Sequence, residues 1–174
     1  LFFSAVIFGN IVDFQNIQLF SSSEIEINKI VAEDNKIIIA GTNENEDMYY
    51  GIIENDDLIF ENTIVGEKED YLSNILISGD SVYLLGFSDS KTGVFEDQRG
   101  FGDIILIKLN SQYEMEWLRH YGGNLLDRAH GIIESSDGYI YICGMTNSSN
   151  IENYSRVEDG FVLKVDKDGN QVWR

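Results

Sequence analysis

Short apolar runs, each bounded by turn residues, recur along the chain. One segment occurs three times, and its copies occupy residues 30–43, 75–88 and 132–147. Each copy joins two apolar runs through a hairpin signal and closes on a glycine. The closing glycines are Gly41, Gly86 and Gly144, which lie 45 and 58 residues apart. A period of this length is typical of repeat architectures, so the pattern predicts repeated pairs of antiparallel strands.

A second block repeats in the same order. Residues 103–110 match residues 159–166, which lie 56 positions later, and a degenerate copy occupies residues 47–54. Taken together, the two blocks predict units of four short strands. Four antiparallel strands in about 45–58 residues is the size of one β-propeller blade. We therefore expect an all-β fold with about three to three and a half four-stranded blades, which is an incomplete propeller.

The repeats divide the chain into three expected blades. Their expected bounds are 24–69, 70–126 and 127–174, with the last blade truncated. Residues 1–23 are either outer strands of a preceding blade or the remnant of a signal peptide, because residues 1–9 are apolar but have no charged start or cleavage site. No stretch approaches the roughly 20 apolar residues that span a bilayer.

Composition supports strands and excludes one class of partner. Ile, Val, Tyr and Phe are common, which favours pleated strands over helices. The 30 acidic and 12 basic residues give a formal charge of −18, so phosphate backbones would be repelled and we expect no nucleic-acid partner. The single cysteine, Cys143, permits no internal disulfide. It shares a repeat position with Ala40 and Leu85, so we expect it in the core.

Two segments resemble a known repeat family. Residues 159–173 read D-G-F-V-L-K-V-D-K-D-G-N-Q-V-W, and residues 117–148 begin W-L-R-H-Y-G-G-N-L-L-D-R-A-H-G-I-I-E. They resemble the SBBP-type β-propeller repeat of bacteria and archaea, and the resemblance extends over most of the chain from about Glu24. The third unit is close to that family's consensus, and the first two have drifted from it. The resemblance implies an extracytoplasmic location (secreted, periplasmic or cell surface) more than a chemistry.

Candidate catalytic and metal residues are sparse. We find no Ser/His/Asp set, no metal-ligand spacing and no Gly-rich phosphate loop, and so expect no catalytic residue, metal or cofactor. Residues 166–170 alternate carboxylates as a calcium loop does, although a hairpin turn is the favoured interpretation. An acid recurs at Asp70, Asp127 and, more loosely, Glu24. We expect it to accept backbone N–H groups between blades, while a ring of such acids could also attract cations.

The candidate binding residues lie in loops that change length. From the closing glycine to the second block there are 6 positions in the first unit, then 17 and 15. Long loops on one face of a repeat usually form the binding surface. The candidates are Phe95, Arg99 and Phe101 in the first long loop, Tyr154 and Arg156 in the second, and Arg128 and His130 in a blade connection. Aromatic and charged groups of this kind suit contact with protein or glycan.

These patterns favour a non-catalytic, extracytoplasmic propeller segment that binds protein or glycan. One alternative is part of a propeller enzyme, either a quinoprotein-like oxidoreductase or a glycan-active domain. Another is a purely architectural repeat array. Because about three blades leave apolar faces uncovered, we also expect either a homo-oligomer or a longer chain that closes the propeller.

Overall fold

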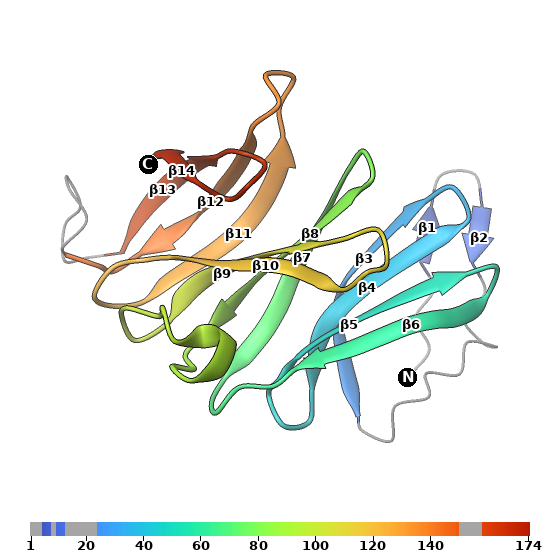
Figure 1. Cartoon of the computed structure of the whole chain (residues 1–174), viewed down its shortest axis with the longest axis horizontal. Helices are drawn as coiled ribbons and strands as arrows, with labels where there is room; N and C mark the ends of the chain where they lie inside the picture. The colour runs from blue at the N-terminus through green and yellow to red at the C-terminus, as the bar shows by residue number, and fades with distance from the viewer. Residues whose placement is uncertain (1–4, 8–9, 13–23, 150–157) are drawn as a thin grey trace.

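The computed structural model describes residues 5–7, 10–12, 24–149 and 158–174. Within this part, three sheets of four antiparallel strands follow one another along the chain (Figure 1). The 3-10 turn η2 (Gly93–Phe95) is the helical element of these residues. No described helix has the length and apolar character to cross a bilayer. The predicted all-β, propeller-like fold of about three blades is confirmed.

Within each four-stranded sheet, every strand pairs with the strands that directly precede and follow it in the chain. The first blade contains β3 (Ile25–Glu33), β4 (Lys36–Asn43), β5 (Met48–Glu54) and β6 (Asp57–Ile64). The second contains β7 (Asp70–Ser78), β8 (Ser81–Ser88), β9 (Asp103–Leu109) and β10 (Met115–Tyr121). The third contains β11 (Asp127–Glu134), β12 (Ile140–Thr146), β13 (Asp159–Val165) and β14 (Gln171–Trp173).

Near the N-terminus, β1 (Ala5–Ile7) and β2 (Asn10–Val12) pair as a separate two-stranded sheet. Most of the segment 1–23 lies outside the described residues. Its two interpretations, preceding blade or signal-peptide remnant, therefore stay predictions.

Because the strands are antiparallel, the connections of each blade lie at the two opposite ends of its strands. The hairpins between first and second strands, and between third and fourth strands, lie at one end (Figure 1). The loops between second and third strands and the connections between blades lie at the other end. We call this end of the blades the loop face, and it includes residues 44–46, 65–69, 89–102 and 122–126.

The first strands of the three blades lie side by side, as the inner strands of a propeller do. The Nδ2 of Asn28 in β3 donates to the carbonyl of Leu72 in β7 at 3.0 Å. The Nδ2 of Asn74 in β7 donates to the carbonyl of His130 in β11 at 3.4 Å. Asparagine side chains thus link each inner strand to the next.

Each inner strand also bulges at one residue, opposite the recurring glycine. The pairing shifts on either side of Asn28, Ser73 and His130. Beside each bulge, the inner-strand backbone approaches the glycine so closely that a Cβ would collide with a carbonyl oxygen. That Cβ would lie 1.8 Å from the oxygen of Glu26 at Gly41, 2.1 Å from that of Tyr71 at Gly86 and 2.0 Å from that of Arg128 at Gly144. This close approach explains why glycine recurs there.

Apolar side chains from neighbouring sheets fill the space between blades. One cluster joins the first and second blades and includes Ile38, Tyr50, Leu84 and Ile105. Another joins the second and third blades and includes Tyr83, Leu106, Ile142 and Leu163. Tyrosine hydroxyls fasten both contacts by donating to carbonyls of the following blade: Tyr50 to Tyr113 at 2.9 Å and Tyr121 to Gly169 at 2.6 Å.

The outer face of the third blade repeats the apolar pattern of the second but is open. Leu85 and Leu106 in the second blade are fully buried, because the third blade covers them. Cys143 and Val162 hold the matching positions in the third blade, where Cys143 is exposed and Val162 is 47% exposed. The expectation that Cys143 lies in the core is therefore wrong, since no described residue covers this face.

Candidate ligand-binding site on the loop face

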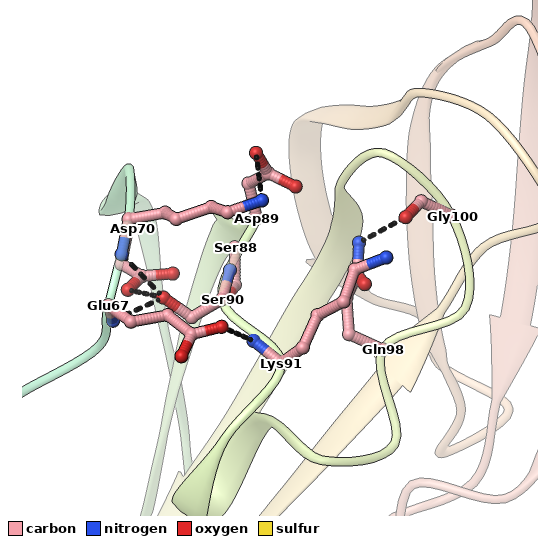
Figure 2. A network of polar contacts seen from close by, with 9 residues as sticks. Glu67, Asp70, Ser88, Asp89, Ser90, Lys91, Gln98 and Gly100 are labelled. Atoms are coloured by element: carbon pink, nitrogen blue, oxygen red, sulfur yellow. Dashed lines mark hydrogen bonds and ion pairs between the residues drawn. The ribbon is translucent and has the colours of Figure 1, made fainter.

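A buried serine ties the long loop 89–102 to the connection between the first two blades. The Oγ of Ser90 donates to the Oδ2 of Asp70 at 2.6 Å and accepts the N–H groups of Glu67 and Lys68 at 2.8 and 3.0 Å. The N–H of Ser90 donates to the Oγ of Ser88 at 3.1 Å. Figure 2 shows these contacts, together with the Nε2 of Gln98 donating to the carbonyl of Gly100.

The same arrangement recurs one junction later. The Oγ of Ser148 donates to the Oδ2 of Asp127 at 2.7 Å and accepts the N–H of Leu125 at 2.9 Å, while its own N–H donates to the Oγ1 of Thr146 at 3.1 Å. Asp127 also accepts the N–H of Gly123 at 2.8 Å. We call the pairs Asp70–Ser90 and Asp127–Ser148 the Asp–Ser latches. Both members of each pair are fully buried.

Asp127 therefore accepts a backbone N–H group of the blade connection, as the sequence predicted, whereas Asp70 reaches the N–H groups of its connection through Ser90. The arrangement does not extend to the first blade. Asp70 pairs with Ser88 and Asp127 with Thr146. In the first blade, the equivalent pair is Ile25 with Asn43. Ile25, and not Glu24, therefore holds the position of Asp70 and Asp127. The latch serines were missed by the sequence analysis, although a hydroxyl residue two positions before each of them, Ser88 and Thr146, repeats in the same way.

Two fully buried carboxylates meet beneath the second junction. A Cβ on Gly122 would lie 2.1 Å from the Oδ1 of Asp103 and 3.0 Å from the Oδ2 of Asp127. The Oδ2 of Asp103 accepts the N–H of Arg99 at 2.9 Å, and the Nη2 of Arg174 lies 3.7 Å from the Oδ1 of Asp127. Burial raises the pKa of Asp103 to about 6, and the neighbouring Asp127 carboxylate adds to the effect.

Because the pKa of Asp103 is raised, lowering the pH should increase the contribution of this residue to the free energy of unfolding. A carboxyl group whose pKa is higher in the folded state binds protons more readily there, so its contribution to stability is full below pH 4 and is lost as the pH rises through 6. We expect Asp103→Asn to remove about 1 kcal/mol of the gain in unfolding free energy between pH 7.5 and pH 5. Urea titrations of both proteins at the two pH values measure this. Equal gains in the two proteins would contradict it.

At its far end, the long loop holds an exposed aromatic ring on a fixed backbone. The ring of Phe101 is 69% exposed. Its N–H donates to the carbonyl of Leu125 at 3.1 Å, and the next residue, Gly102, forms a bridge with Leu126 and accepts the N–H of Asp127 at 3.0 Å. A Cβ at Gly102 would lie 2.1 Å from the Cζ of Phe87, so the loop backbone packs directly on that buried ring.

The other side chains around Phe87 come from two inner strands. Tyr71, the second residue of β7, stacks on Phe87 with 5.4 Å between ring centroids. Arg128, the second residue of β11, places its guanidinium carbon 5.0 Å from the centroid of the Phe87 ring. Phe87 thus lies in contact with Tyr71, Arg128 and the backbone of Gly102. The sequence analysis missed Tyr71 and Phe87, since nothing in the repeat pattern shows that they contact residues of another blade.

The structure brings some of the predicted binding residues together and separates others. Arg128 contacts Phe87, on which Gly102, the residue after Phe101, also packs, and the exposed Arg99 lies two residues before Phe101 on the same loop. Phe95 is fully buried in the cluster between the first two blades, with its ring 6.3 Å from that of His120, so it packs in the core and is not a surface residue.

The remaining three predicted residues add little to this site. His130 is exposed at the bulge of β11, where its carbonyl accepts the bond from Asn74. Tyr154 and Arg156 lie outside the described residues. Within the described part of the chain, no group of three or more His, Cys, Asp or Glu side chains is placed to hold a metal ion.

Comparison with known proteins shows a similarity in fold. The chain matches no family model and no curated protein. Among solved structures, it is similar to a mutant GH32 beta-fructofuranosidase of Bombyx mori in complex with sucrose, with a TM-score of 0.47 and 10% sequence identity. The match covers 90% of this chain and 39% of that enzyme, so the chain spans about two fifths of the enzyme's length. At this identity, the similarity concerns the fold alone.

The comparison nevertheless corrects one expectation. The chain was expected to be non-catalytic, and the solved structure to which it is similar is that of an enzyme. The non-catalytic interpretation is therefore withdrawn. The similarity assigns no reaction to this chain, because 10% identity carries no residue across.

Proposed function

We propose that the loop face of this propeller-like segment binds a carbohydrate, in an extracytoplasmic repeat protein of the SBBP type. The family and the location rest on the sequence resemblance of residues 117–148 and 159–173. The binding rests on the loop face itself. The proposal concerns recognition, and it holds whether or not the full protein acts on the bound sugar.

The observation that carries the proposal is the exposed ring of Phe101 on a fixed backbone. Leaving an apolar ring 69% exposed forfeits the stabilisation that its burial would give. The backbone of Phe101 and Gly102 is bonded to residues 125–127, so the backbone that carries the ring is held in one position. A ligand that covers it gains apolar contact without ordering a loop, and this lowers the cost of binding.

A sugar fits this platform better than a large apolar surface does. One aromatic ring matches the apolar C–H face of one sugar ring, and the exposed Arg99 on the same loop offers N–H donors to sugar hydroxyls. Val65 and Val94 are the other large exposed apolar side chains among the described residues of the loop face. Val65 comes from another connection, and Val94 lies in η2, seven positions before Phe101 on the same loop, whereas specific protein interfaces centre on clustered anchors.

Substitution of Phe101 tests the proposal. We expect the chain to bind at least one oligosaccharide in a glycan-array screen, and Phe101→Ala to weaken that binding about tenfold, as lost ring contacts of about 1.4 kcal/mol would do. Titration calorimetry with the selected oligosaccharide measures the change. The fold should be unaffected, because the ring makes little buried contact.

Trp173→Ala is the matched control. This aromatic side chain is 46% exposed but lies on β14, and it packs against Tyr141 with 5.9 Å between ring centroids. Its removal should leave the oligosaccharide affinity unchanged. An array with no bound glycan, or equal losses from the two substitutions, would show that the loop face is not a carbohydrate site.

A further inference from the structure

Arg128 has an unusual position for a cation in this protein. It is half-buried, and its Nε is fully enclosed without a hydrogen-bond partner. Among the described residues, no carboxylate lies within ion-pair distance of its guanidinium. Its guanidinium carbon lies 5.0 Å from the centroid of the Phe87 ring.

The rest of the molecule makes this lack of a partner notable. The chain has 30 acidic residues and 12 basic ones, so acids are abundant. Other half-buried or partly exposed cations form ion pairs with acids, as Lys164 does with Asp137 at 2.8 Å and Lys108 with Glu116 at 3.1 Å. A guanidinium that is partly removed from water costs free energy unless a charged partner compensates for it.

The fold does not require arginine at this position. By strand register, Arg128 pairs with Met145, Tyr71 pairs with Phe87 and Glu26 pairs with Thr42, which makes these three inner-strand residues equivalent. The equivalent position is therefore occupied by Tyr71 in the second blade and by Glu26 in the first. The positive charge at residue 128 is specific to the third blade.

The contact with Phe87 gives the guanidinium no acceptor for its N–H groups. Its carbon lies 5.0 Å from the centroid of the Phe87 ring, which stacks in turn on Tyr71. A guanidinium carries five N–H donors in a planar fork, which suits it to two parallel hydrogen bonds to a carboxylate.

The net charge selects between anions. A formal charge of −18 repels a doubly charged phosphate more than it repels a singly charged carboxylate. We propose that Arg128 binds the carboxylate of an acidic sugar on the loop face, with Phe101 contacting the sugar ring; this rests on the proposed carbohydrate binding. Gly102, the residue after Phe101, packs on the Phe87 ring, and the guanidinium carbon of Arg128 lies 5.0 Å from the centroid of the same ring, so Arg128 lies beside the part of the loop that carries Phe101.

Nuclear magnetic resonance of the whole chain tests this with glucuronate and glucose as probes. Glucuronate should shift the Arg128 Nε–H resonance and the Phe101 ring resonances, and glucose should shift only the Phe101 ring. Arg128→Met, which keeps an apolar stem over Phe87, should lower the affinity for glucuronate about tenfold and leave that for glucose unchanged. Arg119→Met is the control. Arg119 also lies over an aromatic ring, that of Trp117, but it is an exposed residue of β10 and not part of the proposed site.

The outcomes separate the two proposals. Shifts of Phe101 with both sugars, but no Arg128 shift and no effect of Arg128→Met, would overturn the carboxylate site and leave the carbohydrate site in place. A glucuronate shift at Arg128 without any change at Phe101 would retain an anion site and overturn carbohydrate binding. No shift at either residue with either sugar at millimolar concentration would overturn both.

Discussion

Replacing Gly86 with alanine is expected to lower the free energy of unfolding by about 3 kcal/mol. The new Cβ would lie 2.1 Å from the carbonyl oxygen of Tyr71 and 3.1 Å from the Cδ2 of Leu72. The first contact is with backbone, so relief requires the bulged inner strand to move away from β8. Urea denaturation followed by tryptophan fluorescence measures the loss.

Gly160→Ala provides the matched control, because this glycine also lies in a strand. The nearest atom to its added Cβ is the carbonyl oxygen of Gly144, at an ordinary contact distance of 3.9 Å. We expect a change within about 1 kcal/mol, since alanine fits the space and lowers the entropy of the unfolded chain. Similar losses from the two substitutions would mean that the bulge does not explain the recurring glycine.

The second large effect is expected from Asp127→Ala, which removes the acid of one Asp–Ser latch. Its carboxylate accepts bonds from the N–H of Gly123 and the Oγ of Ser148 and lies 3.7 Å from the guanidinium of Arg174. Each buried donor left without a partner costs about 1–3 kcal/mol, so we expect a loss of about 3–4 kcal/mol. Urea denaturation again gives the value.

Asp89→Ala is its control, since Asp89 also pairs with a cation on the loop face. Its carboxylate lies 3.4 Å from the Nζ of Lys68, and that lysine side chain is 48% exposed. Exposed pairs contribute at most about 1 kcal/mol, so the change should be small. If Asp127→Ala cost no more than this, the latch would not hold the junction.

The repeat pattern predicted the blades because it reflects contacts that every blade makes. The glycines at 41, 86 and 144 recur since each faces a bulged inner strand. The acids Asp70 and Asp127 recur since each holds a blade connection, Asp127 directly and Asp70 through Ser90. Features of this kind leave a periodic trace in one sequence. They were enough for the fold class and for the role of the acids.

Features that depend on the neighbouring blade could not be predicted in the same way. Phe95 lies in a polar loop of the sequence, yet it is buried because η2 places it against the cluster of the first two blades. Cys143 occupies a core position of the repeat, yet it is exposed because no residue in the described part of the chain covers its face. The contact of Arg128 with Phe87 crosses between blades, and no spacing along the chain encodes it.

The sharing of apolar clusters between adjacent blades has a consequence for cooperativity. The second blade contributes to a cluster on each side, whereas the outer face of the third blade leaves Val162 and Ile133 47% and 62% exposed. Stability in such an array is the sum of terms for single repeats and for nearest-neighbour contacts. In the chain of residues 1–174, opening of the third blade therefore breaks one of these shared clusters, while opening of the second blade breaks both. Local unfolding of this chain should begin in the third blade, whose strand β11 carries Arg128, and the central blade should be the last part to lose its structure.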